Sequence, residues 1–282
     1  MTSSVWINGR PHRWVDAADR GFQYGDGLFE TFRIHRGVPL FWRRHMDRLR
    51  RGCERLDLPF PSSELLRREA DTACMGLTEG VLKFQLTRGS GGRGYTPPQE
   101  TLPTRVWCRH PLPDGLEELR KWGARVRLCH TRLGINSALA GIKHCNRLEQ
   151  VLARKEWNDP SVYEGLMCDG EGFLVEGTIS NVFWRRSGML ITPRVDRCGV
   201  AGVVRAWVLD RARQWNAAVK EVRARPEVLA EAEEVFLTNS VIGVVPVVAG
   251  VDRPILGSWP VGSFTARLMS DWKRCLAQEE IV

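Results

Sequence analysis

The sequence has no uninterrupted apolar stretch close to the roughly 20 residues that a helix needs to cross a bilayer. Its first residues, Met1 to Trp6, contain neither the basic segment nor the apolar segment of a secretory signal peptide. The hydrophobic fraction of 43% and the charged fraction of 26% are ordinary for a globular protein. These features predict a cytoplasmic protein without membrane contact, and 282 residues allow two modest domains or one large one.

Metal-binding and disulfide patterns are also missing. The eight cysteines are dispersed, form no Cys-x-x-Cys pair and do not cluster with the six histidines at metal-site spacing. We therefore expect no bound metal, and reduced, mostly buried thiols. The Gly-x-Ser-x-Gly turn of serine hydrolases and the His-Glu-x-x-His helix of zinc peptidases are absent as well, which excludes both kinds of hydrolase.

Basic residues outnumber acidic ones, giving a formal charge of +8. Such a charge is compatible with binding nucleic acid or with binding a small anionic substrate and cofactor. It is equally compatible with solvated helix faces, because the basic residues are dispersed along the chain and form no run. A nucleic-acid-binding module is therefore a remote alternative, and we expect no nucleic-acid partner.

Lysine is scarce, accounting for only six of the 41 basic residues. One of them, Lys143, lies where a glycine-containing approach precedes a segment with Leu148, Val151 and Leu152 on one helical face. Arginine cannot form an imine with an aldehyde, because that reaction needs a neutral primary amine. On this stretch alone, an exposed lysine at a helix start remains the simpler interpretation. The more specific interpretation is a lysine that forms a Schiff base.

Strand-like alternation and helical periodicity occur in both halves of the chain, which predicts an α+β or mixed α/β fold. The expected strands and hairpins are 5–10 with its return at 12–15 after an Asn8-Gly9 turn, 28–34, 38–41, 81–87, 104–109, 125–130, 164–178, 179–184, 189–192, 235–238 and 244–248. The expected helices are about 46–56, 62–76, 143–157, 198–214 and 260–279. Prolines and a glycine without periodicity suggest a linker at 110–118, between an N-terminal α/β domain at 1–109 and a C-terminal domain at 119–282 that carries Lys143.

Two glycine-rich stretches could approach an anion. The first, Gly89–Gly94, lacks the Gly-Lys-Ser/Thr ending of a Walker loop, so we interpret it as a flexible loop that brings Arg93 and Tyr95 to a cleft. The second, Cys198–Gly202, precedes an expected helix whose unsatisfied N–H groups favour a phosphate. A glycine-assisted helix entry explains this second stretch equally well.

Three polar residues attract attention near strand ends. Glu176 follows an apolar run and precedes a glycine, although an exposed strand glutamate is the default interpretation. Asn181 and Asn239 each lie where a strand meets a loop, and turn formation alone would explain both.

Several segments, in the same order, resemble the fold-type IV pyridoxal-phosphate enzymes, which form the class-IV aminotransferase family. The segment Asp19–Thr31 is similar to the N-terminal motif of that family, and His45–Leu49 matches its His-x-x-Arg-Leu helix. Lys143 corresponds to the Schiff-base lysine, and Glu176–Phe183 matches the segment whose glutamate pairs with the pyridine nitrogen. The resemblance runs nearly end to end and implies a two-domain fold like that of D-amino acid aminotransferase.

The resemblance also implies a cofactor, pyridoxal 5'-phosphate, and a homodimer. It assigns Lys143 as cofactor anchor and catalytic base, and Glu176 as the partner of the pyridine nitrogen. The implied phosphate contacts are Arg48, Val200, Ala201, Ser240 and Val241. The candidate substrate contacts are Arg93, Arg33, Phe29 and Tyr95.

Within this family, Thr87–Tyr95 and Leu139–Ala153 resemble the aminodeoxychorismate lyase branch. That branch forms 4-aminobenzoate and pyruvate from 4-amino-4-deoxychorismate, in folate biosynthesis. Branched-chain transaminases typically carry Gly-Glu-Asn where this chain has Ile179-Ser180-Asn181. D-amino acid or branched-chain transamination is the alternative activity.

Overall fold

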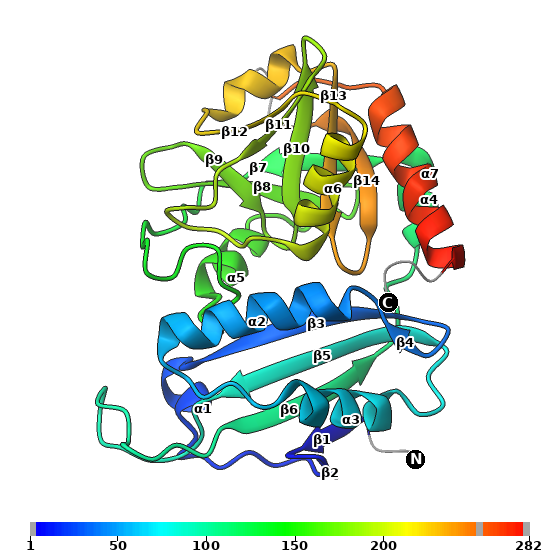
Figure 1. The fold of residues 1–282 in the computed structure, drawn as a ribbon. Helices are drawn as coiled ribbons and strands as arrows, with labels where there is room; N and C mark the ends of the chain where they lie inside the picture. The colour runs from blue at the N-terminus through cyan, green and yellow to red at the C-terminus, as the bar shows by residue number, and fades with distance from the viewer. Residues whose placement is uncertain (1–3, 252–255, 279–282) are drawn as a thin grey trace. The chain divides into compact units, whose positions relative to one another are not determined.

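Two sheets, one in each of two units, organise the computed structural model, which describes residues 4–251 and 256–278 (Figure 1). Unit 1 comprises the chain up to Leu112 together with Ile142–Asn146, and unit 2 comprises Pro113–Gly141 and Arg147–Gln278. The expected N-terminal domain ended at 109, close to this division. Lys143, however, groups with unit 1 and not with the C-terminal part of the chain as expected.

Unit 1 is built on a six-stranded antiparallel sheet in the order β2-β1-β6-β5-β3-β4. The strands are β1 (Val5–Ile7), β2 (Arg10–Pro11), β3 (Gly27–His35), β4 (Val38–Pro39), β5 (Glu79–Thr87) and β6 (Thr104–His110). The helices are α1 (Arg20–Tyr24), α2 (Trp42–Leu56) and α3 (Ser63–Cys74). Asn8 and Gly9 both have positive φ, as the Asn-Gly hairpin turn requires, but the returning strand is Arg10–Pro11 and not 12–15 as expected.

Helices α2 and α3 cover one face of this sheet. The ring centres of Phe32 in β3 and His45 in α2 are 4.3 Å apart. Trp107 of β6 donates through Nε1 to Glu69 of α3. Phe32, Phe84 and Trp107 are fully buried beneath the two helices. Because strand side chains alternate, Phe29, Thr31 and Arg33 lie on the opposite face.

The segment that carries Lys143 is not helical, so the expected helix at 143–157 was wrong. Phe29 N donates to Lys143 O at 2.9 Å, and Cys145 N donates to Gly27 O at 2.9 Å, which attaches the segment to the edge of β3. Helix α5 is confined to Leu148–Arg154. Its leucines and valine are exposed and only Ala153 is buried, so the apolar residues do not pack as their spacing predicted.

Unit 2 is built on an eight-stranded mixed sheet in the order β12-β11-β10-β13-β14-β7-β8-β9. The strands are β7 (Ala124–Leu128), β8 (Glu164–Cys168), β9 (Leu174–Gly177), β10 (Asn181–Arg186), β11 (Met189–Pro193), β12 (Val219–Val222), β13 (Glu234–Asn239) and β14 (Gly243–Gly250). The remaining helices are α4 (Leu116–Trp122), α6 (Val203–Gln214), α7 (Ser263–Gln278) and the 3-10 helix Pro226–Glu231. The stacked rings of Phe183 and Phe236 join β10 to β13 in the buried core.

Two boundaries in and beside unit 2 differ from expectation. The expected linker at 110–118 is shorter, because His110 still belongs to β6 and α4 begins at Leu116. The helix expected from Cys198 begins only at Val203, with Gly202 as its N-cap.

Six of the eight cysteines are buried. Across residues 4–251 and 256–278, no helix is long and apolar enough to span a membrane.

Candidate active site

Lys143 lies on the face of the unit 1 sheet that α2 and α3 leave uncovered. Its Nζ is 4.4 Å from the centre of the Phe29 ring, and Lys83 Nζ is 5.4 Å from the same centre. Arg33 lies on this face too, four residues along β3 from Phe29, with its Nη2 3.9 Å from Glu79 Oε2. The structure therefore brings Lys143 together with Phe29, one of the predicted substrate contacts, whereas Arg33 lies further along β3, beside Glu79.

Lys83 was missed at the sequence level. It lies opposite Thr31 in the ladder between β3 and β5, which puts it on the same face as Phe29. The available signal was the scarcity of lysine combined with strand alternation. Lys83 and Lys143 thus place two amines beside Phe29, which suits a substrate with carboxylates, whereas Arg33 is paired with Glu79.

Arg48 lies in α2, in a buried ion-pair cluster with Glu30 and His45, and Lys143 is near enough for its charge to contribute, after burial, to lowering the pKa of His45. Glu30 Oε1 accepts from Arg48 Nε at 2.9 Å and Glu30 Oε2 from Arg48 Nη2 at 2.5 Å. Glu30 Oε2 also lies 2.5 Å from His45 Nδ1. Burial opposes ionisation of Glu30, but the charges and hydrogen bonds of Arg48 and His45 prevail and lower its pKa to about 2. This pairing fixes the Arg48 guanidinium in α2, the helix that the family motif predicted.

We expect Glu30→Gln to destabilise the protein by about 3 kcal/mol at pH 7, because the charge that pairs with Arg48 is lost. A carboxyl group with a lowered folded-state pKa contributes stability above its unfolded pKa, near 4.5, and loses that contribution as the pH falls toward about 2. The difference in unfolding free energy between wild type and variant should therefore shrink between these values. Urea titrations followed by tryptophan fluorescence at pH 7 and at acidic pH measure it. An undiminished difference in acid would contradict this assignment, and Glu117→Gln, at an exposed helix ion pair, is the control.

Glu176 is not an exposed strand residue, since only 4% of its surface is accessible. Its Oε2 accepts from Val200 N at 2.8 Å and from Asn181 Nδ2 at 3.4 Å, and Asn181 Nδ2 also donates to Val200 O at 2.9 Å. Asn181 was expected to serve only a turn, so the sequence interpretation missed its contact with Glu176. A Cβ on Gly202 would lie 2.0 Å from Asn181 Oδ1, which leaves room there only for glycine.

Three of the predicted phosphate donors of unit 2 already donate to groups within the protein. Val200 N–H already donates to Glu176, Ala201 N–H donates to Gly141 O at 3.0 Å, and Val241 N–H donates to Asn239 Oδ1 at 2.9 Å. The role of the three amides in phosphate binding stays a prediction, and it requires these bonds to be exchanged for bonds to the phosphate. Helix α6 begins three residues beyond Val200, at Val203, and within the described residues no side chain caps its N-terminus at Gly202.

Comparison with known proteins gives this arrangement a context. The family model "Amino-transferase class IV" matches residues 27–249, a span that includes Lys143 and Glu176. The chain belongs to the class IV aminotransferase family. The predicted family and the fold-type IV architecture are thereby confirmed.

Three relatives of this class IV protein are especially similar. Aminodeoxychorismate lyase of Vibrio harveyi is 33% identical, over 94% of this chain and 98% of that protein. A putative branched-chain-amino-acid aminotransferase of Methanocaldococcus jannaschii is 31% identical, over 95% of each protein. The crystal structure of 4-amino-4-deoxychorismate lyase from Pseudomonas aeruginosa is 43% identical, with a TM-score of 0.91 over 96% of this chain and 98% of that one.

The glycine-rich loop of this family member is held in place by Arg20. The Arg20 guanidinium donates to the carbonyl oxygens of Gly94, Tyr95 and Thr96 at 3.0, 3.2 and 3.4 Å. Arg93 and Tyr95 are themselves exposed, and within the described residues neither contacts Lys143. The loop is therefore ordered by α1, but the structure does not bring its two predicted substrate residues to the lysine.

We expect Arg20→Ala to loosen this loop, because three carbonyl oxygens lose their donor at once. The measurement is limited proteolysis with trypsin, which should cleave after Arg93 about tenfold faster in the variant. The control is Arg67→Ala, which removes an exposed pair with Asp71 in α3. Equal cleavage rates in wild type and Arg20→Ala would show that the loop is held by other contacts.

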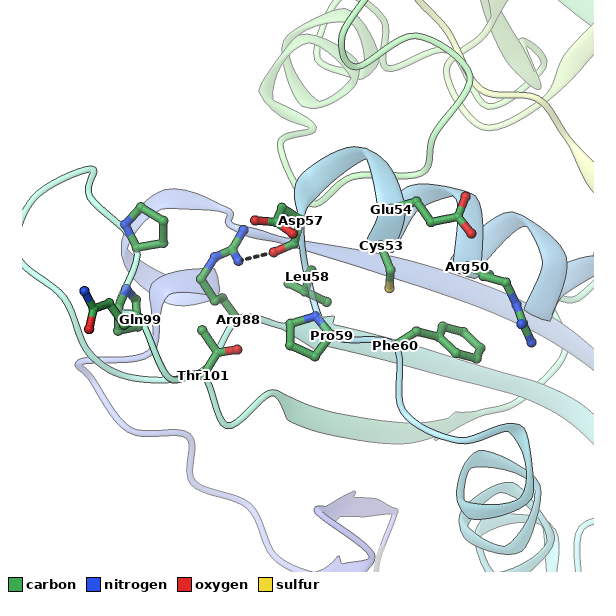
Figure 2. Close-up of a pocket in the computed structure, with 12 residues that line it drawn as sticks. Arg50, Cys53, Glu54, Asp57, Leu58, Pro59, Phe60, Arg88, Gln99 and Thr101 are labelled. Carbon is green, nitrogen blue, oxygen red and sulfur yellow. Dashed lines mark hydrogen bonds between the residues drawn. The ribbon is translucent and has the colours of Figure 1, made fainter.

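A cavity of about 500 Å³ lies in unit 1 between the end of α2 and residues 97–101 (Figure 2). None of the predicted site residues lines it. Arg88 at its wall donates to the main-chain oxygens of Leu56 and Asp57, and Figure 2 shows it beside the end of α2. Burial raises the pKa of the Cys53 thiol to about 12, so this wall offers no thiolate at neutral pH.

Proposed function

We propose that this protein is a 4-amino-4-deoxychorismate lyase that uses pyridoxal 5'-phosphate and releases 4-aminobenzoate and pyruvate. The observation that carries the proposal is the 43% identity to the Pseudomonas aeruginosa lyase, sustained over 96% of this chain. The two amines beside Phe29 support it independently, because the substrate carries two carboxylates.

The residues present fit the cofactor chemically. Lys143 offers the primary amine, Arg48 a buried cation, and the uncapped start of α6 an anion site. Glu176 offers a buried carboxylate beside Gly199, where a Cβ would lie 3.3 Å from the carboxyl group. When bound, pyridoxal phosphate would supply an electron sink for the carbon that loses its proton.

Each residue then has a distinct task. Lys143 Nζ would hold the cofactor and would then accept the proton from the amine-bearing carbon of the substrate. Glu176, as a carboxylate, would hold a proton on the pyridine nitrogen, which would strengthen the electron sink. The Phe29 ring lies beside Lys143 Nζ, 4.4 Å from the ring centre, and would help to orient the amine.

The remaining steps belong to the substrate. Once the proton has left, the C–O bond at the neighbouring ring carbon would break, and enolpyruvate would leave with the electron pair and take up a proton at its terminal carbon to become pyruvate. The ring becomes aromatic as this bond breaks, which makes the elimination favourable. Arg33 and Lys83 orient the carboxylates during this step, and Arg93 on its ordered loop is a further candidate contact.

Transamination of D-amino acids or branched-chain amino acids is the second candidate, supported by the 31% identity to the putative branched-chain aminotransferase. The test incubates the holoenzyme with D-alanine or L-leucine alone, without a keto acid. A transaminase transfers the amino group to the cofactor in one half-reaction and bleaches its visible absorbance. The lyase proposal predicts that this absorbance persists with both amino acids.

We also propose a cytoplasmic homodimer. The large exposed apolar side chains in unit 1 support a dimer, because a second chain could cover them; they include Trp14, Phe22, Tyr95 and Leu102. Light scattering should then give a mass of two chains of 32.0 kDa each.

A further inference from the structure

Glu164 is the only residue of β8 with an ionisable carboxyl group, and it is completely buried. Within the described part of the chain, no arginine, lysine or histidine forms an ion pair with it. Its oxygens instead accept five hydrogen bonds. Oε1 accepts from Gly165 N at 2.9 Å, Thr178 N at 3.0 Å and Thr178 Oγ1 at 2.5 Å. Oε2 accepts from Ile179 N at 3.2 Å and Ser180 Oγ at 2.7 Å.

Four of these five donors belong to the turn 178–180, which connects Glu176 at the end of β9 to Asn181 at the start of β10. The turn is closed by Gly177 N, which donates to Ser180 O at 2.7 Å. A Cβ on Gly177 would come within 2.8 Å of the Glu164 carboxyl carbon. The turn is thus wrapped around the Glu164 carboxylate, and its shape sets where Glu176 and Asn181 lie.

A carboxylate suits this position because both of its oxygens only accept hydrogen bonds. The amide of a glutamine would direct an NH2 group toward either the three donors at Oε1 or the two donors at Oε2. At least two donors would then face another donor, in a place that water does not reach. The turn would have to move, and the carboxylate of Glu176 would move with it.

We propose that Glu164 is a positioning residue that aims the Glu176 carboxylate at the pyridine nitrogen of pyridoxal phosphate by fixing the turn 178–180. This inference rests on the proposed function. Glu164 itself touches neither cofactor nor substrate in this account. Its effect should therefore depend on the pyridine nitrogen, whereas a purely structural role would not.

The test measures dissociation constants for pyridoxal phosphate and for its analogue with C–H in place of the ring nitrogen. We expect Glu164→Gln to weaken binding of pyridoxal phosphate about tenfold and to change binding of the analogue by less than about threefold. Glu176→Gln should show the same selectivity. The matched control is Glu234→Gln in β13, which removes another buried carboxylate of unit 2 that accepts from Phe264 N and Thr265 N. This control should bind both compounds as the wild type does.

Equal weakening of both compounds by Glu164→Gln, or an effect no larger than that of Glu234→Gln, would overturn the inference. If Glu164→Gln does not fold, Ser180→Ala removes one donor and keeps the carboxylate. It should then show the same selectivity with a smaller change of about threefold, and unselective binding would overturn the inference equally. A wild-type protein that binds neither compound would instead contradict the proposed function.

Discussion

Lys143→Ala is expected to abolish the covalent bond to pyridoxal phosphate and to lower kcat by about a thousandfold or more. The variant loses both the amine that anchors the cofactor and the base that moves the proton. Treatment with borohydride followed by peptide mapping should find the reduced cofactor on Lys143 in the wild type and nowhere in the variant.

Lys83→Ala is the informative companion, because Lys83 Nζ lies 5.4 Å from the same Phe29 ring. It should retain the reducible bond while the KM for aminodeoxychorismate rises, since Lys83 is assigned to the substrate carboxylates. Near-normal steady-state turnover in Lys143→Ala would refute the assignment of Lys143, and a bond found on Lys83 would move the anchor there.

Glu176→Gln is expected to retain pyridoxal phosphate at saturating concentration and to lower kcat by about a hundredfold or more. An amide cannot hold a proton on the pyridine nitrogen as a carboxylate does, whereas Arg48, Lys143 and the start of α6 still bind the cofactor. The measurement compares bound cofactor, from absorbance after release in alkali, with kcat in the same preparation. If both match the wild type, Glu176 is a strand residue without a catalytic role.

Local features of the fold could be predicted where neighbouring residues decide the conformation. The alternating pattern predicted a strand at 28–34, and β3 spans Gly27–His35. Ser62 was expected at the start of a helix, and its Oγ accepts from Leu65 N at 3.2 Å as the N-cap of α3. In both places the conformation is decided by residues that are close to one another in the sequence.

The position of Lys143 could not be predicted in this way. Its segment pairs with Gly27 and Phe29, more than 100 residues earlier in the chain. The periodicity of the segment itself cannot indicate such a long-range contact. The helix start near Cys198 was placed too early for a related reason. The glycines there suggested a helix entry, but the amide of Val200 is engaged by Glu176, 24 residues before it.

Glu164 gave a signal that went unused. A glutamate is unusual at the start of a five-residue strand in which every residue is buried. A carboxylate in front of an apolar run could have prompted a search for the groups that donate hydrogen bonds to it. The answer lies in hydrogen bonds from Thr178, Ile179 and Ser180, which no single stretch of sequence shows.

The central claim is tested most directly by supplying purified holoenzyme with 4-amino-4-deoxychorismate and no keto acid. The proposed lyase should form 4-aminobenzoate and pyruvate in equal amounts over many turnovers, because elimination returns the cofactor unchanged in each cycle. A transaminase would stop after one half-reaction without a keto acid as amine acceptor. Robust transamination of D-alanine or a branched-chain amino acid, with no 4-aminobenzoate from aminodeoxychorismate, would contradict the lyase assignment while leaving the roles of Lys143 and Glu176 in place.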